Sequence, residues 1–395
     1  MKILILSFYY PPDLSAGSFR TAALVRQLQA AVPPDSQIDI ITTQPNRYHS
    51  LAAASSADER LGALRVRRIT LPAHHSGMRD QAKAFSVYAR AALKLLAGER
   101  YDLVYGTSSR LFTAMLAVVA GRKAQAPVYL DIRDIFVDTM KDVLPRSIAL
   151  PALPVLSLLE RFTIRHAARV NLVSAGFLPW FQSRYPRQQF DVHPNGIDDE
   201  FLDLLPQPTT PRERAQVLYA GNVGEGQGLH HVLPELAKRC ADQFDFVVIG
   251  DGGRRAALQA ALAAANVSNV TLLPPMPRLE LIPAYQHADV LFLHLNSHDA
   301  FLKVLPSKLF EYAALGKPVL AGVAGYAATF VQQNVSNAAV FTPCDAVAGE
   351  AALRSLSLQP TARGGFIEKY RRDSVMKQLA GLLLQTAAAG PKPMP

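Results

Sequence analysis

The chain has 395 residues, of which 49% are hydrophobic and 18% are charged. This composition is too apolar for a disordered chain, and the length predicts two or three globular domains with sizeable cores. The net charge of +9, from 41 basic and 32 acidic residues, is compatible with an anionic partner but does not require one, and we expect no nucleic-acid partner.

The first apolar run, residues 2–8, looks like the start of a signal peptide. Pro11, Pro12 and Asp13 follow it at once and no small-residue cleavage site is present, so we interpret the run as a buried parallel strand. The longest apolar stretches, 111–121 and 148–159, are too short to span a bilayer. Two cysteines, Cys240 and Cys344, exclude a disulfide scaffold and a cysteine-rich zinc site. We therefore expect a cytoplasmic protein, soluble or peripheral at the membrane.

Predicted strands and helices alternate along both halves of the chain. The first half has predicted strands at 2–8, 38–42, 66–71, 103–105, 128–132 and 170–173, and helices that include 18–31, 80–97 and 111–121. Strands recur in the second half at 217–220, 246–249, 270–273, 290–293, 318–322 and 338–341. The alternation predicts an α/β protein with two doubly wound domains, joined by a proline-rich linker at 205–214. Ligands in such folds bind beyond the carboxyl ends of the strands, so the loops there are the candidate sites.

Two loops of the first half carry candidate site residues. Gly17 and Ser18 stand at the predicted start of helix 18–31, where free N–H groups suit a phosphate or a sugar hydroxyl, although Ser18 could also be a simple N-cap. Arg133 and Asp134 directly follow strand 128–132, which suits a ligand site, with a local ion pair or helix cap as the alternative. No dinucleotide-binding or P-loop motif is present. The acidic residues 198–200 lack a histidine at helical spacing, so we interpret them as a solvated hinge.

Two loops of the second half are rich in glycine. Residues 219–229 place four glycines between a predicted strand and a helix, which favours an anion-binding nest over plain tight turns. A weaker version of the same pattern, Gly250-Asp251-Gly252-Gly253, follows the next strand.

The motif at residues 306–319 gives the strongest signal. Pro306 and Ser307 start a predicted helix, Lys308 lies in its first turn, and Glu311 follows three residues later on the same face. A lysine there suits a diphosphate, and a carboxylate one turn on suits two ribose hydroxyls. The alternative is a surface ion pair, which contributes little to stability.

Six segments together make the chain resemble a family 4 glycosyltransferase of the GT-B fold. The segments are YYPPDLSAGS, RDIFVD, HPNGIDDEF, YAGNVGEGQGL, VVIGDGG and PSKLFEYAALGKPV. The resemblance covers essentially the whole chain and is greatest to the bacterial subgroup that transfers sugars, often N-acetylated amino sugars, in O-antigen, capsule or exopolysaccharide assembly. It implies two Rossmann-like domains facing across a cleft. Residues 1–205 would bind the acceptor, residues 206–373 would bind the nucleotide sugar, and a helix at about 374–390 would pack back on the first domain.

The resemblance also implies roles for individual residues. Arg133 and Asp134 would bind the donor sugar and the acceptor, and Lys308 and Glu311 would bind phosphate and ribose. The residues implied in donor binding are Gly17, Ser18, Gly221, Asn222, Gln227, Gly250, Asp251, Met276, Lys303, Ser307, Lys308 and Glu311.

Four positions depart from the family pattern. Arg133 stands where many relatives have histidine, and Lys303 where many have glutamate. Asn222 and Gln227 stand where many relatives have arginine and lysine. The identity of the donor sugar and the residues that bind its diphosphate are therefore left open. Lys303 could supply the positive charge that the arginine and lysine of the relatives provide.

The activity that the resemblance implies is transfer of a sugar from a nucleotide diphosphate, with retention at the anomeric carbon, to a lipid-linked or saccharide acceptor. UDP is the expected nucleotide of the donor, and GDP remains an alternative. The chain contains no Asp-x-Asp motif, so we expect neither a metal nor any other cofactor. The leaving phosphate would take the acceptor proton on the same face, and Asp134 as a nucleophile is the alternative.

Helix 80–97 suggests a membrane-facing surface. Arg79, Lys83, Arg90 and Lys94 form a basic stripe opposite an apolar face, which suits the anionic inner-membrane surface as well as an ordinary surface helix. Two other functions stay open: a UDP-sugar 2-epimerase of the same architecture, and a non-catalytic partner subunit of a transferase.

Overall fold

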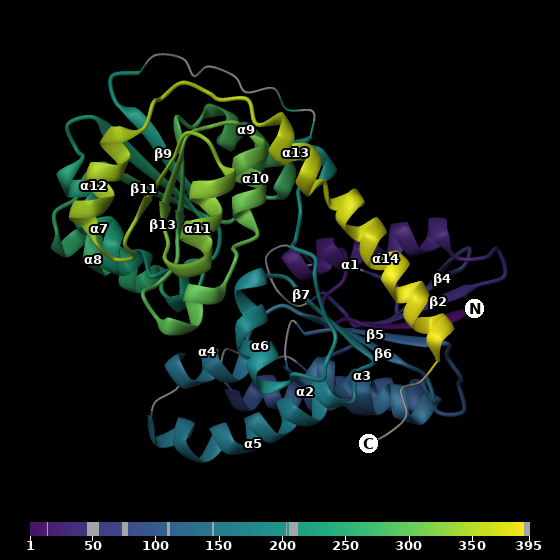
Figure 1. Cartoon of the computed structure of the whole chain (residues 1–395). Coiled ribbons are helices and arrows are strands. Elements are labelled where there is room, and N and C mark those ends of the chain that lie inside the picture. Colours follow the sequence, from purple (N-terminus) through teal and green to yellow (C-terminus); the bar gives the residue numbers. More distant parts are fainter. Residues whose placement is uncertain are drawn as a thin grey trace. The chain divides into compact units, whose positions relative to one another are not determined.

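The computed structural model describes residues 1–13, 15–45, 55–72, 78–108, 111–143, 146–202, 204 and 212–390. These residues form two compact units (Figure 1). The first unit comprises Met1–Asn195 and the chain from Arg372 onward, and the second comprises Gly196–Arg371. The change of unit falls before the predicted boundary at residue 205, because Ile197 already donates a backbone hydrogen bond to Tyr370 of the second unit (2.7 Å). Residues 205–211 of the predicted linker lie outside the described residues.

The first unit is built on a mainly parallel sheet. Among the described residues its order is β3-β4-β2-β1-β5-β6-β7-β8, and only the β3–β4 pair is antiparallel. The strands are β1 (Lys2–Leu6), β2 (Gln37–Thr43), β3 (Asp58–Leu61), β4 (Leu64–Ile69), β5 (Leu103–Thr107), β6 (Val128–Ile132), β7 (Arg169–Leu172) and β8 (Phe190–Val192). The helices are α1 (Ala16–Ala31), α2 (Met78–Leu95), α3 (Leu111–Ala124), α4 (Phe136–Val143), α5 (Arg146–Arg165), α6 (Leu178–Arg184) and α14 (Arg372–Ala389).

The last helix returns to the unit in which the chain begins. Met376, Leu379 and Leu383 of α14 are fully buried in one core with side chains of β1 and α1. Figure 1 shows α14 beside α1. This is the segment for which the sequence predicts a return to the first domain.

The second unit is a smaller doubly wound sheet in which every strand pair is parallel. Its order among the described residues is β11-β10-β9-β12-β13-β14, and it has a separate apolar cluster on each face. The strands are β9 (Ala215–Ala220), β10 (Phe244–Ile249), β11 (Val270–Leu273), β12 (Val290–His294), β13 (Val319–Gly322) and β14 (Ala338–Phe341). The helices are α7 (Leu229–Arg239), α8 (Arg255–Ala264), α9 (Arg278–His287), α10 (Lys308–Ala314), α11 (Gly325–Asn334), α12 (Ala346–Ser355) and α13 (Gly364–Tyr370).

The α/β class and the two doubly wound domains are confirmed. Each predicted strand corresponds to an observed one, whereas β3 and β8 are additions at the two edges of the first sheet. The sequence of β3, Asp-Glu-Arg-Leu, is mostly exposed and charged, so no apolar pattern marks it. The apolar stretch 148–159 lies within α5, which continues through Pro151 and Pro154. None of the helices in the described part of the chain combines the length and apolarity needed to cross a membrane.

Candidate functional site

Gly17 and Ser18 lie in the first turn of α1, after the carboxyl end of β1. Ser15 is the N-cap, since its Oγ accepts a hydrogen bond from the Ser18 N–H (3.1 Å); the alternative reading of Ser18 as the N-cap is therefore wrong. Ser18 is completely buried, and its hydroxyl has no hydrogen-bond partner among the described residues. This buried hydroxyl at a helix N-terminus therefore has unused hydrogen-bonding capacity.

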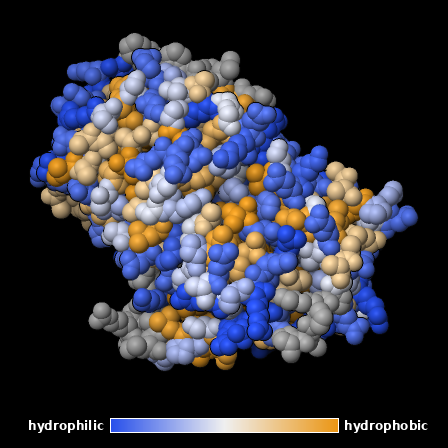
Figure 2. Space-filling view, in the orientation of Figure 1, coloured by the Kyte–Doolittle hydropathy of each residue, from blue (hydrophilic) through white to orange (hydrophobic). Residues whose placement is uncertain are grey.

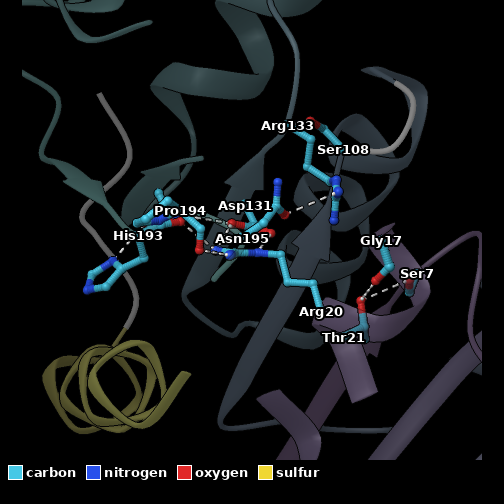
Figure 3. A network of polar contacts seen from close by, with 11 residues as sticks. Ser7, Gly17, Arg20, Thr21, Ser108, Asp131, Arg133, His193, Pro194 and Asn195 are labelled. Atoms are coloured by element: carbon cyan, nitrogen blue, oxygen red, sulfur yellow. Dashed lines mark hydrogen bonds and ion pairs between the residues drawn. The ribbon is translucent and has the colours of Figure 1, made fainter. Parts of the chain in front are cut away.

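Arg133, at the end of β6, lies against the same turn. A Cβ at Gly17 would lie 3.3 Å from its Nη1, and Figure 3 shows the side chain extending toward Gly17. The Arg133 backbone N–H donates to Ser108 Oγ (3.1 Å), and Nη2 donates to Asn195 Oδ1 (3.5 Å). Nη1 is buried and finds no partner in the described part of the chain. The structure thus brings Gly17, Ser18 and Arg133 together as a set of hydrogen-bond donors, while Asp134 is exposed.

A buried ion pair between Arg20 and Asp131 lies next to this site. Arg20 of α1 and Asp131 of β6 are both fully buried, and the guanidinium donates to both carboxylate oxygens (2.9 and 3.0 Å). Burial alone would raise the pKa of Asp131, but the adjacent Arg20 outweighs it and the pKa is lowered. Arg20 also donates to the carbonyls of Pro194 (2.6 Å) and His193 (2.9 Å), which end the first unit (Figure 3). Arg20 therefore fixes α1 to the strand ends that carry Arg133 and Asn195.

His193 completes this network in its neutral form. Asn171 donates from Nδ2 to Asp131 Oδ1 (2.6 Å), so its Oδ1 is the acceptor for the His193 Nδ1–H (2.8 Å). Burial, followed by the charge of Arg20, lowers the pKa of His193.

In the second unit, Lys308 at the start of α10 packs across Gly221, which follows β9. A Cβ at Gly221 would lie 2.4 Å from Lys308 Cε and 3.3 Å from its Nζ. Gly250, after β10, lies equally close to this turn, since its Cβ would be 1.8 Å from the Gly221 carbonyl oxygen. Glycine at both positions lets the two strand ends and the lysine side chain converge. Burial, together with Arg278, lowers the pKa of Lys308, whereas Glu311 opposes this effect.

The loop between Gly221 and α7 offers open backbone amides. The N–H groups of Asn222, Gly224, Glu225 and Gly226 have no acceptor among the described residues. Asn222 Nδ2 donates to Gln227 Oε1 (2.7 Å), so these two predicted diphosphate residues bind each other. Three consecutive open amides, at residues 224–226, are what an anion-binding nest requires, and binding of a diphosphate by this loop stays a prediction.

His294 and Asn296, at the end of β12, fix the conformation of this loop. His294 donates from Nδ1 to the Gln227 carbonyl (2.6 Å) and accepts at Nε2 from the Cys344 N–H (3.0 Å). Burial lowers the pKa of His294 to about 4, so it stays neutral at physiological pH. Asn296 binds the carbonyls of Gly226 (2.9 Å) and Glu225 (2.9 Å). No motif in the sequence marks either residue as part of the site.

Glu311, one turn after Lys308, lies near Arg278 of α9. Arg278 Nη2 is 3.7 Å from Glu311 Oε1 and also contacts the carboxylate of Asp198. Asp198 is 8% exposed, so the interpretation of residues 198–200 as solvated is wrong for Asp198, whereas Asp199 and Glu200 are exposed. In the sequence, Asp198 is only one member of an acidic run. The ion pair between Asp198 and Arg278 could not be predicted, because the two residues lie 80 positions apart.

The other predicted donor residues lie around these groups. Met276 is half-buried and packs against the core beneath α10, and Ser307 immediately precedes α10 without a side-chain capping bond. Asp251 is exposed, and its backbone carbonyl accepts from the Val223 N–H (2.9 Å). Lys303 donates to the Asp299 carbonyl of its own 3₁₀ turn (3.3 Å).

One group of side chains in the described part of the chain could supply three metal ligands. It consists of Glu225, His230 and His231, whose ligand atoms lie within 4.8 Å of one another. Glu225 is already paired with Arg254 (2.5 Å), a cation that competes with a metal for the carboxylate. The expectation of a metal-free site remains a prediction.

The basic stripe of α2 is exposed, but its opposite face is not. Lys83, Arg90 and Lys94 are exposed, while Phe85, Tyr88, Ala92 and Leu96 are buried in the first unit. Leu95 is 36% exposed. The side chain of Arg79 lies outside the described residues. The apolar face of α2 therefore belongs to the protein core, and only its charged face is open to a membrane surface.

Two family models match this chain, one in each half of the sequence. Residues 15–196 match the family described as "Glycosyl transferase 4-like domain", and residues 203–373 match "Glycosyl transferases group 1". The glycosyl transferase WcaI of Escherichia coli (strain K12), whose name places it in colanic acid biosynthesis, is 25% identical over 80% of this chain and 82% of its own length.

Two solved structures share the fold over nearly the whole chain. Alr3699/HepE from Anabaena, solved with UDP-glucose, has a TM-score of 0.68 at 16% identity and covers 98% of this chain and 100% of its own. WaaG, a glycosyltransferase involved in lipopolysaccharide biosynthesis, has a TM-score of 0.63 at 16% identity, covering 98% and 99% of the two chains.

Proposed function

We propose that this chain, which belongs to the glycosyltransferases of the GT-B fold, transfers a sugar with retention from a UDP-sugar to a lipid-linked or saccharide acceptor, without a metal. The contact of Lys308 with Gly221, the residue before the open amides of Asn222, Gly224, Glu225 and Gly226, is the observation that carries the proposal. A cation thus contacts the first residue of a loop that carries N–H donors without acceptors, and a cation with N–H donors is what binding of a diphosphate requires.

The second unit would bind and activate the donor. As the bond between the anomeric carbon and the phosphate oxygen breaks, negative charge develops on the diphosphate. Lys308 and the loop amides stabilise this charge without reorganisation, because the protein already orients them. Glu311 accepts hydrogen bonds from the two ribose hydroxyls.

Retention needs no nucleophilic side chain in this scheme. The acceptor oxygen bonds to the anomeric carbon on the face that the diphosphate leaves, and the acceptor proton passes to the departing phosphate oxygen. Arg133 and the Ser18 hydroxyl, with unused hydrogen-bonding capacity in the first unit, position the reacting sugar and its phosphate. Asp134 binds the acceptor.

The names of the similar proteins support the choice of substrates. One protein of the same fold was solved with UDP-glucose, and WcaI is named for colanic acid biosynthesis. These names support a proposed role in the assembly of bacterial surface polysaccharide, and we propose the cytoplasmic face of the inner membrane as the place of action. O-antigen, capsule and exopolysaccharide units are the acceptors to screen.

Membrane contact would bring the enzyme to a lipid-linked acceptor. Val155 and Leu158, on one face of α5, are 58% and 66% exposed, and the exposed Arg161 and Arg165 follow them. Figure 2 shows hydrophobic atoms at the lower edge of the view, where Figure 1 places α5. An exposed apolar stripe with flanking cations suits an anionic lipid surface.

Co-sedimentation with phosphatidylglycerol vesicles tests this contact. Replacing Val155 and Leu158 by serine, or reversing the charges of Lys83, Arg90 and Lys94, should each reduce binding. Leu279→Ser is the control for lost apolar surface, because Leu279 is 74% exposed on the second unit. Equal binding of all variants would contradict a peripheral location.

Turnover of the Lys308→Ala and Glu311→Ala variants tests the proposed activity. UDP release from a panel of UDP-sugars, in the presence of bacterial lipid extract, should fall by at least about a hundredfold in both variants. The exposed Lys238→Ala change is the control. The anomeric configuration of the product, read by NMR, tests retention. Pathway function that survives both substitutions would favour a non-catalytic partner subunit, and C2 inversion of free UDP-sugar would favour an epimerase.

A further inference from the structure

We propose that Arg278 is a positioning residue that orients Glu311 and so makes the donor site selective for ribose over deoxyribose nucleotides. The inference rests on the proposed function, in which Glu311 binds the ribose.

Arg278 lies at the centre of a cluster of carboxylates within the second unit. Its Nη2 contacts Asp198, lies 3.7 Å from Glu311 and lies 3.9 Å from Glu200. The side chains of Arg278, Asp198 and Glu311 are only 15%, 10% and 16% exposed. Water screens charges poorly at such exposure, so the position of the guanidinium strongly influences each carboxylate.

Two elements fix the position of the guanidinium. Arg278 is the first residue of α9, and Asp198 stands where the chain enters the second unit. The Arg278 guanidinium also lies over the Phe201 ring, with 5.0 Å between Cζ and the ring centroid. Asp198 and Phe201 therefore fix the cation near Glu311 from outside α10.

The distance between Arg278 and Glu311 is the key feature. At 3.7 Å the two groups attract by charge but are too far apart to form a hydrogen bond. No side chain or amide in the described residues donates a hydrogen bond to the Glu311 carboxylate. Both carboxylate oxygens can therefore accept hydrogen bonds from two neighbouring hydroxyls, as a ribose 2′,3′-diol presents them.

Loss of Arg278 should change the orientation of Glu311 rather than the diphosphate contacts. Without the guanidinium, Asp198 and Glu200 repel Glu311, and its carboxylate turns away. Asp198→Asn removes the charge that keeps the Arg278 guanidinium in place. Arg278 can then bind Glu311 directly and occupy the carboxylate oxygens that the ribose hydroxyls would use. Both substitutions should reduce recognition of the diol and spare the contacts of Lys308.

The test compares calorimetric Kd values for UDP and 2′,3′-dideoxy-UDP. The native chain should bind UDP at least about tenfold more tightly, because two charge-assisted hydrogen bonds are lost with the analogue. Arg278→Met and Asp198→Asn should each bring the ratio of the two Kd values close to that of Glu311→Gln. Lys308→Ala should weaken both ligands and keep the ratio. Glu200→Gln is the control, since Glu200 is 45% exposed and is a distant partner of Arg278.

Three results separate the possible failures. A native-like ratio in folded Arg278→Met and Asp198→Asn variants overturns the inference and leaves the proposed function standing. A native ratio near one overturns the inference together with the ribose role of Glu311, and leaves the proposed sugar transfer standing. Failure of the native chain to bind either nucleotide overturns both. If Arg278→Met does not fold, the Asp198→Asn ratio decides the inference by itself.

Discussion

Lys308 can pack against residue 221 only because that residue is glycine and has no Cβ. Gly221→Ala would place a Cβ 2.4 Å from Lys308 Cε, so the lysine side chain would have to move. We predict at least about tenfold weaker UDP binding by calorimetry, because the lysine side chain is displaced and a side chain strains the backbone at Gly221, where φ is +156°. Gly253→Ala is the control, since nothing lies within 4 Å of a Cβ there. Equal affinities of the two variants would argue against a diphosphate at Lys308.

The Arg20–Asp131 pair makes a prediction about stability. Removing Arg20 leaves a fully buried carboxylate without its cation, so Arg20→Met should lower the free energy of unfolding by about 3–5 kcal/mol. Urea unfolding measures this loss. Arg26→Met removes an exposed pair with Asp373 (58% and 42% exposed) and should cost less than about 1 kcal/mol. Similar losses in both variants would mean that the buried pair has no special role.

Individual site residues differ in how well the sequence predicts them. Lys308 and Glu311 are three residues apart on one helix, so local spacing is enough to place them on one face. Asp131 lies 111 residues from Arg20, and Arg278 lies 80 residues from Asp198, so only the folded chain brings either pair together. The sequence therefore predicts the side chains proposed to bind the ligand. It does not predict the ion pairs that hold their surroundings in position.

We expect the stability of the first unit to depend on pH through Glu160 of α5. This carboxyl group is 4% exposed and accepts a hydrogen bond from the Tyr185 hydroxyl (2.9 Å), which follows α6. Burial raises its pKa from 4.5 to about 7, although the Tyr185 bond opposes the shift. The folded state therefore favours the protonated form, and the resulting stability is complete below pH 4.5 and lost as pH rises through 7.

We predict that the Glu160→Gln variant is less sensitive to pH than the native chain. The free energy of unfolding of the native chain should fall by up to about 3 kcal/mol between pH 4.5 and 8 because of this group, and the glutamine variant should lack that component. Urea unfolding at both ends of the range provides the measurement, with the exposed Glu368→Gln as control. An unchanged pH dependence in the Glu160 variant would show that the carboxyl is already ionised in the folded state.

Strands and helices can be predicted from the sequence where their burial requires a regular pattern of apolar residues. The parallel strands of both sheets are apolar runs, since helices cover them on both faces. The edge strand β3 is mostly exposed and therefore carries no such run. The start of α1 is misplaced for a different reason: Ser15 and Ser18 are equally good N-caps in sequence, and only the hydrogen bond from Ser18 N–H to Ser15 Oγ distinguishes them.

At the scale of the whole molecule, the two units divide the chemistry. The second unit has Lys308, Glu311 and the open amides, which suit a nucleotide diphosphate. The first unit has Ser18 and Arg133 and ends in α14, whose buried residues share its core. The alternation of strands and helices predicts this two-domain organisation, but it does not predict that the chain changes unit at Asn195, because that boundary depends on tertiary contacts of residues 197 and 198.

The most direct test is a thermal-shift panel of UDP- and GDP-sugars with the full chain, in the presence of EDTA. A ligand at a hundred times its Kd stabilises the folded state by about 2.7 kcal/mol, which raises the unfolding midpoint measurably. We predict that one UDP-sugar raises the midpoint more than UDP alone and that EDTA does not change the result. A panel in which no nucleotide or nucleotide sugar shifts the midpoint would contradict a metal-free donor site built on Lys308 and Glu311.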